Sequence, residues 1–305
     1  MNAGDAALDR PARTRHKTFS PTRIFAISSN TLLELVRLKV FHFFLLFALL
    51  IIGSSAFMVN FSFQEQFQVL KDVSLGAMSI FTWLLAVLST AMLLPKDIED
   101  RTLYTILAKP VPRFEYLIGK LLGVLILLLI ATIVMGGMFA ATLYFRQEMV
   151  IAQGMKDYAG STQAEIDAMV RHVRESTFTW SLLPGVVLIY LKAALFASLT
   201  LFISTFASSW IFTVIISVVI YLIGHVQATA REYWMLTGNL TPVKQIFLGL
   251  VALIFPDLQL FNLIDDIVVG NVIAMSMFVK TAGLGVIYLG VYLLVAYIVF
   301  AGKEL

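Results

Sequence analysis

The feature that most constrains this chain is a set of six long apolar runs, each able to cross a membrane as one helix. A bilayer-spanning helix needs about 20 mostly apolar residues to cross a hydrocarbon core of roughly 30 Å. Only 13% of the residues are charged, whereas soluble domains carry about 25%. The runs predict an all-α integral membrane protein with transmembrane helices at 40–59, 75–94, 116–145, 183–206, 210–226 and 279–301.

A seventh apolar run, 246–255, has ten residues and is followed by Pro256. Ten residues are too few to span the hydrocarbon core. A short apolar helix at this place is expected either to lie in the membrane interface or to enter and leave on one side. The sequence leaves these two alternatives open.

The positions of the basic residues predict the orientation. Lys and Arg near the ends of transmembrane helices favour the cytoplasmic side. With the N-terminus inside, 13 of the 22 basic residues face the cytoplasm, so both termini are predicted to be cytoplasmic. These residues are Arg10, Arg13, Arg15, Lys17, Arg23, Arg37, Lys39, Lys96, Arg101, Lys109, Arg113, Lys120 and Lys303.

Two different segments precede the first transmembrane helix. Residues 1–19 are small, polar and basic, which predicts a disordered cytoplasmic tail held near anionic lipid. Ser20-Pro21 then suits a helix start, with Ser as the cap and Pro at the first position. Apolar and polar residues separate onto two faces over 20–39, so we expect an amphipathic helix in the inner interface.

The stretch 95–120, PKDIEDRTLYTILAKPVPRFEYLIGK, joins the second and third predicted transmembrane helices. Its acidic first turn suits a helix N-terminus, and Pro110 and Pro112 end the short helix that follows. We therefore expect a short, rigid cytoplasmic helix that could transmit force from a docked partner. An ordinary charged loop is the alternative that composition leaves open.

The two segments on the predicted outer side, 146–180 and 228–278, are long. In the first, Thr162-x-x-Glu165 forms a capping box before an amphipathic helical pattern. We expect both segments to be helical extracytoplasmic loops, the first with a helix that rests on the outer face of the membrane.

The 95–120 stretch resembles the cytoplasmic loop of ABC-2-type ABC transporter permeases, and within them the copper-enzyme-maturation and gliding-motility group. Further similarities are TLLELVRLKVF at 31–41, the link at 204–209 and the ending at 302–305. Many members have Gly where this chain has Arg101. The resemblance rests on an acidic segment, a Thr-Leu pair, a Pro-containing turn and a Gly-Lys pair: Asp97, Glu99 and Asp100; Thr102-Leu103; Lys109 to Arg113; Gly119-Lys120.

The resemblance implies a permease subunit of the bacterial inner membrane that pairs with a second permease protomer and binds a separate ABC ATPase subunit. Residues 96–108 would be the coupling helix. The ATPase-coupling residues would be Asp97, Ile98, Glu99, Asp100, Arg101, Thr102, Leu103, Ile106 and Leu107. The turn into the next helix would comprise Pro110, Pro112, Arg113, Gly119 and Lys120.

The chain carries no G-x-x-x-x-G-K-[ST] loop, the motif that cradles nucleotide phosphates. We therefore expect it not to be an enzyme and to bind no cofactor itself, with ATP and Mg²⁺ held by the partner ATPase. The spacing of the His residues predicts no metal site. A net charge of +3 gives no support to a nucleic-acid partner, and membrane lipids are the remaining expected partners.

Lys192 lies within the fourth predicted transmembrane helix. An ionisable residue at membrane depth is a functional candidate, but the long stem of a lysine could also reach outward to the interface. Three functions stay open: transport, ATPase-driven conformational work on an extracytoplasmic partner, and a membrane-embedded enzyme. Neither the substrate nor the choice between a homodimer and a heterodimer can be predicted from the sequence.

Overall fold

A computed structural model describes residues 19–57, 63–99, 111–157, 160–236, 243, 246, 255–271 and 273–303. Every regular element in these ranges is helical. The elements are α1 (Pro21–Val36), α2 (Lys39–Ser54), the 3₁₀ turn η1 (Ser55–Phe57), α3 (Phe63–Ala91), α4 (Leu93–Glu99), α6 (Arg113–Asp157), α7 (Gln163–Thr177), α8 (Leu182–Phe206), α9 (Trp210–Leu236), η2 (Leu258–Phe261), α11 (Ile264–Val269) and α12 (Met275–Ala301).

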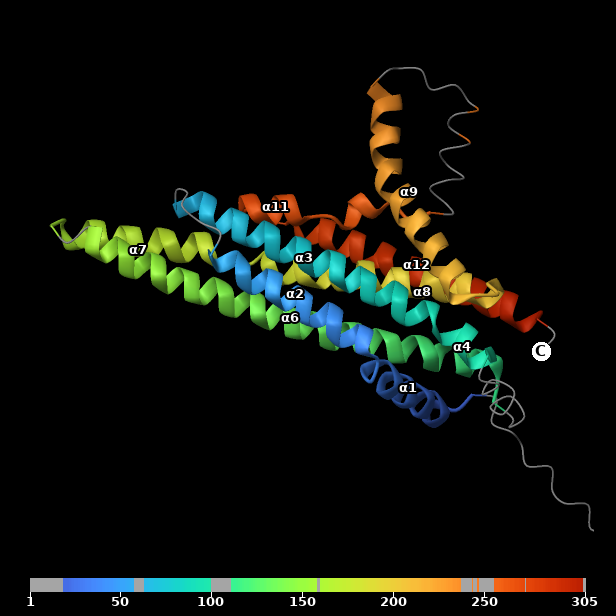
Figure 1. Ribbon diagram of the computed structural model, residues 1–305. Helices are drawn as coiled ribbons and strands as arrows, with labels where there is room; N and C mark the ends of the chain where they lie inside the picture. The colour runs from blue at the N-terminus through green and yellow to red at the C-terminus, as the bar shows by residue number, and fades with distance from the viewer. Residues whose placement is uncertain are drawn as a thin grey trace, which may run out of the picture.

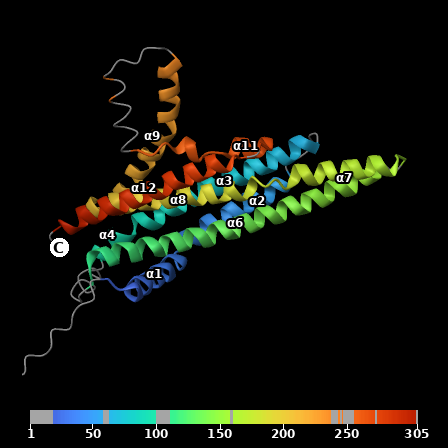
Figure 2. The ribbon, with the colours of Figure 1, turned by 180° about the vertical axis from the view of Figure 1, so that it is seen from behind.

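The long helices form one elongated bundle. Figures 1 and 2 show α2, α3, α6, α8 and α12 running side by side, whereas α9 crosses them and its last turns leave the bundle. Six helices in the described ranges are long and apolar enough to cross a membrane. The prediction of an all-α protein with six membrane-crossing helices is therefore confirmed at this level.

Helix α8 is the centre of the bundle and packs against α3, α6, α9 and α12. It is apolar on all sides, which is typical of a helix surrounded by others. In its most apolar stretch 72% of the residues are buried, against 22% in α2 and in α12. Small side chains permit the close approach of its neighbours, and those at 193, 194, 197 and 198 are all buried.

Two helices are longer than the predicted transmembrane segments. Helix α6 has 45 residues, which corresponds to about 68 Å at 1.5 Å per residue and is about twice the hydrocarbon thickness. Helix α3 begins at Phe63, twelve residues before the predicted 75–94. Apolarity identifies only the part of a helix that lipid would contact, so its polar extensions were not predicted.

Helix α1 packs lengthwise against the first turns of α6, in parallel register. A Cβ added at Gly119 would lie 2.7 Å from Ile27, and one added at Gly123 would lie 2.7 Å from Thr31. Both contacts join positions 92 apart, so the two helices run alongside each other. This packing was not predicted. The placement of 20–39 in the membrane interface stays a prediction.

Helix α7 lies on the last turns of α6. The predicted capping box is present, because the Thr162 backbone N–H donates to Glu165 Oε2 at 2.9 Å. A Cβ added at Gly154 of α6 would lie 2.7 Å from Met169 of α7, and Val173 is buried. The apolar face of α7 therefore contacts the protein, where we expected it to rest on the membrane.

The two ends of the described chain lie at the same end of the bundle. Ser20 N donates to Glu115 Oε1 at 2.8 Å near the start of α6. Arg113, the first residue of α6, donates to carbonyl groups at the end of α12. We call this end of the molecule the inner end and the opposite one, which holds α7 and α11, the outer end.

Candidate functional site

The candidate site is a cluster of charged residues at the inner end, where residues 100–110 connect α4 to α6. Helix α3 ends at Ala91, a turn follows at Met92, and α4 continues the chain to Glu99. Pro95 is the third residue of α4, where the missing N–H leaves no helical hydrogen bond unmade. Helix α4 therefore holds the first described residues of the predicted coupling segment.

Asp97 points into the bundle. Its residue is 7% exposed, and its Oδ2 lies 2.7 Å from the ammonium of Lys120, which is 4% exposed. The hydroxyl of Tyr116 also donates to Asp97 Oδ2. A buried carboxylate is stable only when it is paired and hydrogen-bonded, and this one has both kinds of partner.

Glu34 of α1 completes a network with two lysines. Lys96 Nζ donates to Glu34 Oε1 at 2.7 Å, and Lys120 Nζ lies 3.8 Å from Glu34 Oε2. Lys120 of α6 is thus shared between carboxylates of α1 and α4. We name this set, Glu34, Lys96, Asp97, Tyr116 and Lys120, the inner cluster.

A second ion pair holds the start of α1. Arg23 Nε donates to Glu115 Oε2 at 2.7 Å, and Arg23 Nη2 donates to Glu115 Oε1 at 2.9 Å. Two parallel hydrogen bonds fix the relative orientation of the guanidinium and the carboxylate as well as the distance between them. The Glu115 side chain is 1% exposed, so the carboxylate is enclosed where α1 meets α6.

Arg113 connects α6 to the end of α12. Its Nη1 donates to the carbonyls of Phe300, Ala301 and Lys303 at 2.9, 2.7 and 3.0 Å. The last carbonyls of a helix have no partner within the helix, so a cation there is favourable. Lys303 Nζ in turn donates to the Thr205 carbonyl near the end of α8 at 3.2 Å.

The structure brings together some of the predicted site residues and separates others. Asp97 and Lys120 meet, while Glu99 is exposed and Ile98 is half-buried. Gly119 and Lys120 belong to α6, about two helical turns after its start, so they are not part of the turn that Pro112 and Arg113 form. Seven predicted residues lie outside the described residues: Asp100, Arg101, Thr102, Leu103, Ile106, Leu107 and Pro110.

The position of Asp97 differs from the sequence interpretation, which placed its carboxylate against an ATPase. The carboxylate is directed into the chain and is already paired with Lys120. Sequence reasoning also missed Glu34, Glu115 and Tyr116 as members of this region. Their type and helical face were visible, but their pairings join residues 19 to 95 positions apart, which no local pattern reveals.

Lys192 is directed into the bundle. It is 4% exposed, about ten residues or 15 Å into α8, and its Nζ lies 3.5 Å from Nε2 of His225. The ammonium also lies 5.6 Å from the ring centre of Tyr221, within the range of a cation–π contact. The structure thus favours an interior role over the alternative in which the lysine stem reaches outward.

The inner cluster connects helices through ion pairs and hydrogen bonds. Its charges neutralise one another and join α1, α4 and α6. In the described ranges, no group of three or more His, Asp or Glu residues could hold a metal ion.

The sequence was compared with models of known protein families and with curated proteins, and neither comparison gave a match. The function must therefore be argued from the residues and their arrangement.

Proposed function

We propose that this chain is the permease subunit of an ABC-2-type ABC transporter, which couples ATP hydrolysis on a separate ATPase subunit to substrate movement across the membrane. The observation that carries the proposal is the inner cluster. Helix α4, which holds Asp97, ends at Glu99, and α6 begins at Arg113, so these two helices flank residues 100–110 in the sequence. Ion pairs among α1, α4 and α6 support both attachment points.

The proposal divides the coupling residues into two groups. Asp97 anchors α4 to α6 through Lys120. The exposed Glu99, with Asp100, Arg101 and Leu103 beyond it, faces the ATPase. Force applied to the docked segment then reaches α3 through α4, and α1 and α6 through the inner cluster, because buried ion pairs resist separation.

The partners follow from the same proposal. The ATPase subunit binds ATP and Mg²⁺, and a second permease protomer, identical or related, completes the pathway. The two ends of the described chain lie at one end of the bundle, which agrees with an even number of crossings and with two cytoplasmic termini. Together with the basic residues near this end, this supports a multi-pass protein of the bacterial inner membrane.

A second candidate function is conformational work on an extracytoplasmic partner without transport. The length of α6 favours it, since the helix continues beyond the other long helices with α7 against it (Figure 1). A photo-reactive amino acid at the exposed Asp157 distinguishes the two functions. ATP-dependent capture of an outer protein would support conformational work, whereas ATP-dependent solute movement in vesicles without such a protein supports transport.

The test of the proposal is co-purification of the tagged chain with an ATPase in mild detergent. We expect Asp100→Lys and Leu103→Asp to abolish recovery of the ATPase, because both change the proposed docking face. Asp97→Asn should retain docking but uncouple ATP hydrolysis from movement, because it weakens an internal anchor. Asp157→Lys at the outer end is the control with the same charge change. Undiminished ATPase recovery with both docking variants would reject the proposal.

A further inference from the structure

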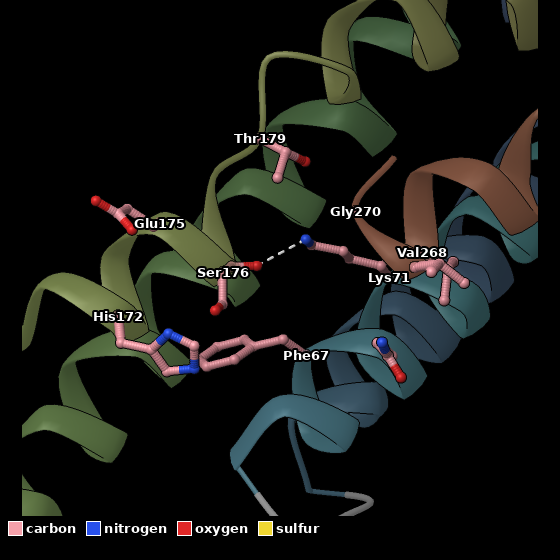
Figure 3. Close-up of a pocket in the computed structure, with 10 residues that line it drawn as sticks. Phe67, Lys71, His172, Glu175, Ser176, Thr179, Val268 and Gly270 are labelled. Carbon is pink, nitrogen blue, oxygen red and sulfur yellow. Dashed lines mark hydrogen bonds between the residues drawn. The ribbon is translucent and has the colours of Figure 1, made fainter. Parts of the chain in front are cut away.

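The outer end holds a cavity of about 250 Å³ between α3, α7 and α11. Figure 3 shows side chains from these three helices around it, with Lys71 reaching across from α3 towards the end of α7. The cavity lies more than one helical turn outward of the predicted 75–94 segment. Its lining residues include Phe67, Lys71, Ser176, Thr179, Val268 and Gly270.

Lys71 is a buried cation that forms no ion pair with a carboxylate of the described residues. The residue is 2% exposed, and its ammonium donates to the Ser176 carbonyl at 2.8 Å. None of the ion pairs found among the described residues includes it. An ammonium carries three N–H donors, and only one of them has an acceptor among the residues that the structure describes.

A second polar group in the lining also lacks a partner. The hydroxyl oxygen of Thr179 is buried and makes no hydrogen bond. An unmade hydrogen bond of a buried polar group is costly, and most buried polar atoms in proteins have a partner. Lys71 and Thr179 therefore line one cavity from two different segments, and each has a hydrogen-bond donor for which the described residues supply no acceptor.

A purely structural role for Lys71 explains part of this arrangement. Ser176 is the second-to-last residue of α7, and a lysine near the last carbonyls of a helix is favourable. That contact uses one N–H and accounts for neither the cavity nor the Thr179 hydroxyl. An exposed lysine would also make this contact without the cost of burying a charge.

We infer that this cavity binds the anionic oxygen group, a carboxylate or a phosphate, of a small ligand, with Lys71 as its counter-ion and Thr179 as a second donor. Glu175 does not compete for Lys71, because its carboxylate points away from the ammonium in Figure 3. The ligand group comes either from a solute on the outer side or from an anionic lipid headgroup. The inference does not rest on the proposed transport function.

Titration calorimetry on the delipidated full chain in a neutral detergent tests the solute source. The probes are acetate, succinate and inorganic phosphate. The lipid source is tested by reconstituting the chain into phosphatidylcholine vesicles with and without phosphatidylglycerol, and by counting the phosphatidylglycerol molecules that co-purify after re-extraction.

Three variants and one control connect the signal to the cavity. Lys71→Met should weaken binding by about 10- to 100-fold, the effect of losing a hydrogen bond to a charged group. Lys71→Arg should retain most of the affinity, and Thr179→Val should lose about 3- to 10-fold. Lys156→Met removes the same charge from an exposed site on the outer part of α6 and should change nothing.

The possible outcomes distinguish a solute site, a lipid-headgroup site and the absence of an anion site. Saturable binding of a soluble anion that depends on Lys71 supports a solute site, and Lys71-dependent retention of phosphatidylglycerol supports a headgroup site. The inference is overturned if neither probe binds, or if binding is equal in the wild type and Lys71→Met. Thr179→Val retains the Lys71 contact with α7, so it provides the decisive comparison should Lys71→Met fail to fold.

Discussion

Each end of the bundle holds a buried lysine, but the groups that surround the two ammonium groups differ. At the inner end, Lys120 lies 2.7 Å from Asp97 and 3.8 Å from Glu34. At the outer end, the similarly buried Lys71 contacts one backbone carbonyl and borders a cavity. Because a buried charge is stable only when it is compensated, the first lysine is part of the scaffold, and the second is the lysine that we infer binds an anionic group.

The largest expected effect lies at the inner end. Lys120→Met removes the ammonium that lies 2.7 Å from the buried Asp97 carboxylate, so we expect a loss of about 3–5 kcal/mol in the free energy of unfolding. Denaturation in detergent measures this. The double variant Lys120→Met/Asp97→Leu should recover part of the loss, because both charges of this ion pair are then absent. If the double variant loses as much free energy of unfolding as Lys120→Met and Asp97→Leu lose in sum, Lys120 and Asp97 are not coupled.

A smaller effect is expected from the packing of α1 on α6. Gly123→Ala places a Cβ 2.7 Å from Thr31 and 2.9 Å from the Ser28 carbonyl, and overpacking of this kind costs about 1–3 kcal/mol. Limited proteolysis between α1 and α2 should become faster. Gly137→Ala in the same helix is the matched control, since nothing lies within 4 Å of its added Cβ. Equal behaviour of the two variants would show that α1 is not held here.

The smallest effect is expected at the outer lysine. Lys71→Met loses one hydrogen bond to Ser176 but also removes the cost of burying a lone cation. The two contributions offset each other, and we expect the free energy of unfolding to change by less than about 1 kcal/mol. Hydrogen exchange at the end of α7 should rise only slightly. If Lys71→Met lowers the free energy of unfolding as much as Lys120→Met does, the two lysines contribute equally to stability and the comparison between the two ends is wrong.

The sequence allowed the membrane-crossing helices to be predicted, because each needs only a local apolar run. It could not predict that Asp97 faces inward. The turn at Met92 separates α4 from α3, and the helical phase after such a break depends on packing. The contact of Lys192 with His225 could not be predicted for the same reason, because it depends on how two helices pack.

The outer cavity was beyond sequence reasoning for a related reason. Its walls come from residues 67–71, 172–179 and 268–270, which lie far apart along the chain. In the sequence, Lys71 is only one basic residue on the predicted outer side, between the first and second predicted transmembrane helices. Its significance depends on the absence of an ion pair to Lys71 among the described residues, which is a property of the assembled helices.

The uninterrupted length of α6 has a consequence for how a small displacement propagates. A straight rod of about 68 Å that pivots at its inner end by about 5° displaces its far tip by about 6 Å, comparable to one helical pitch. Because α7 is seated on that tip, a rotation too slight to disturb the packing near Lys120 would carry α7 through a distance that a neighbouring molecule could sense.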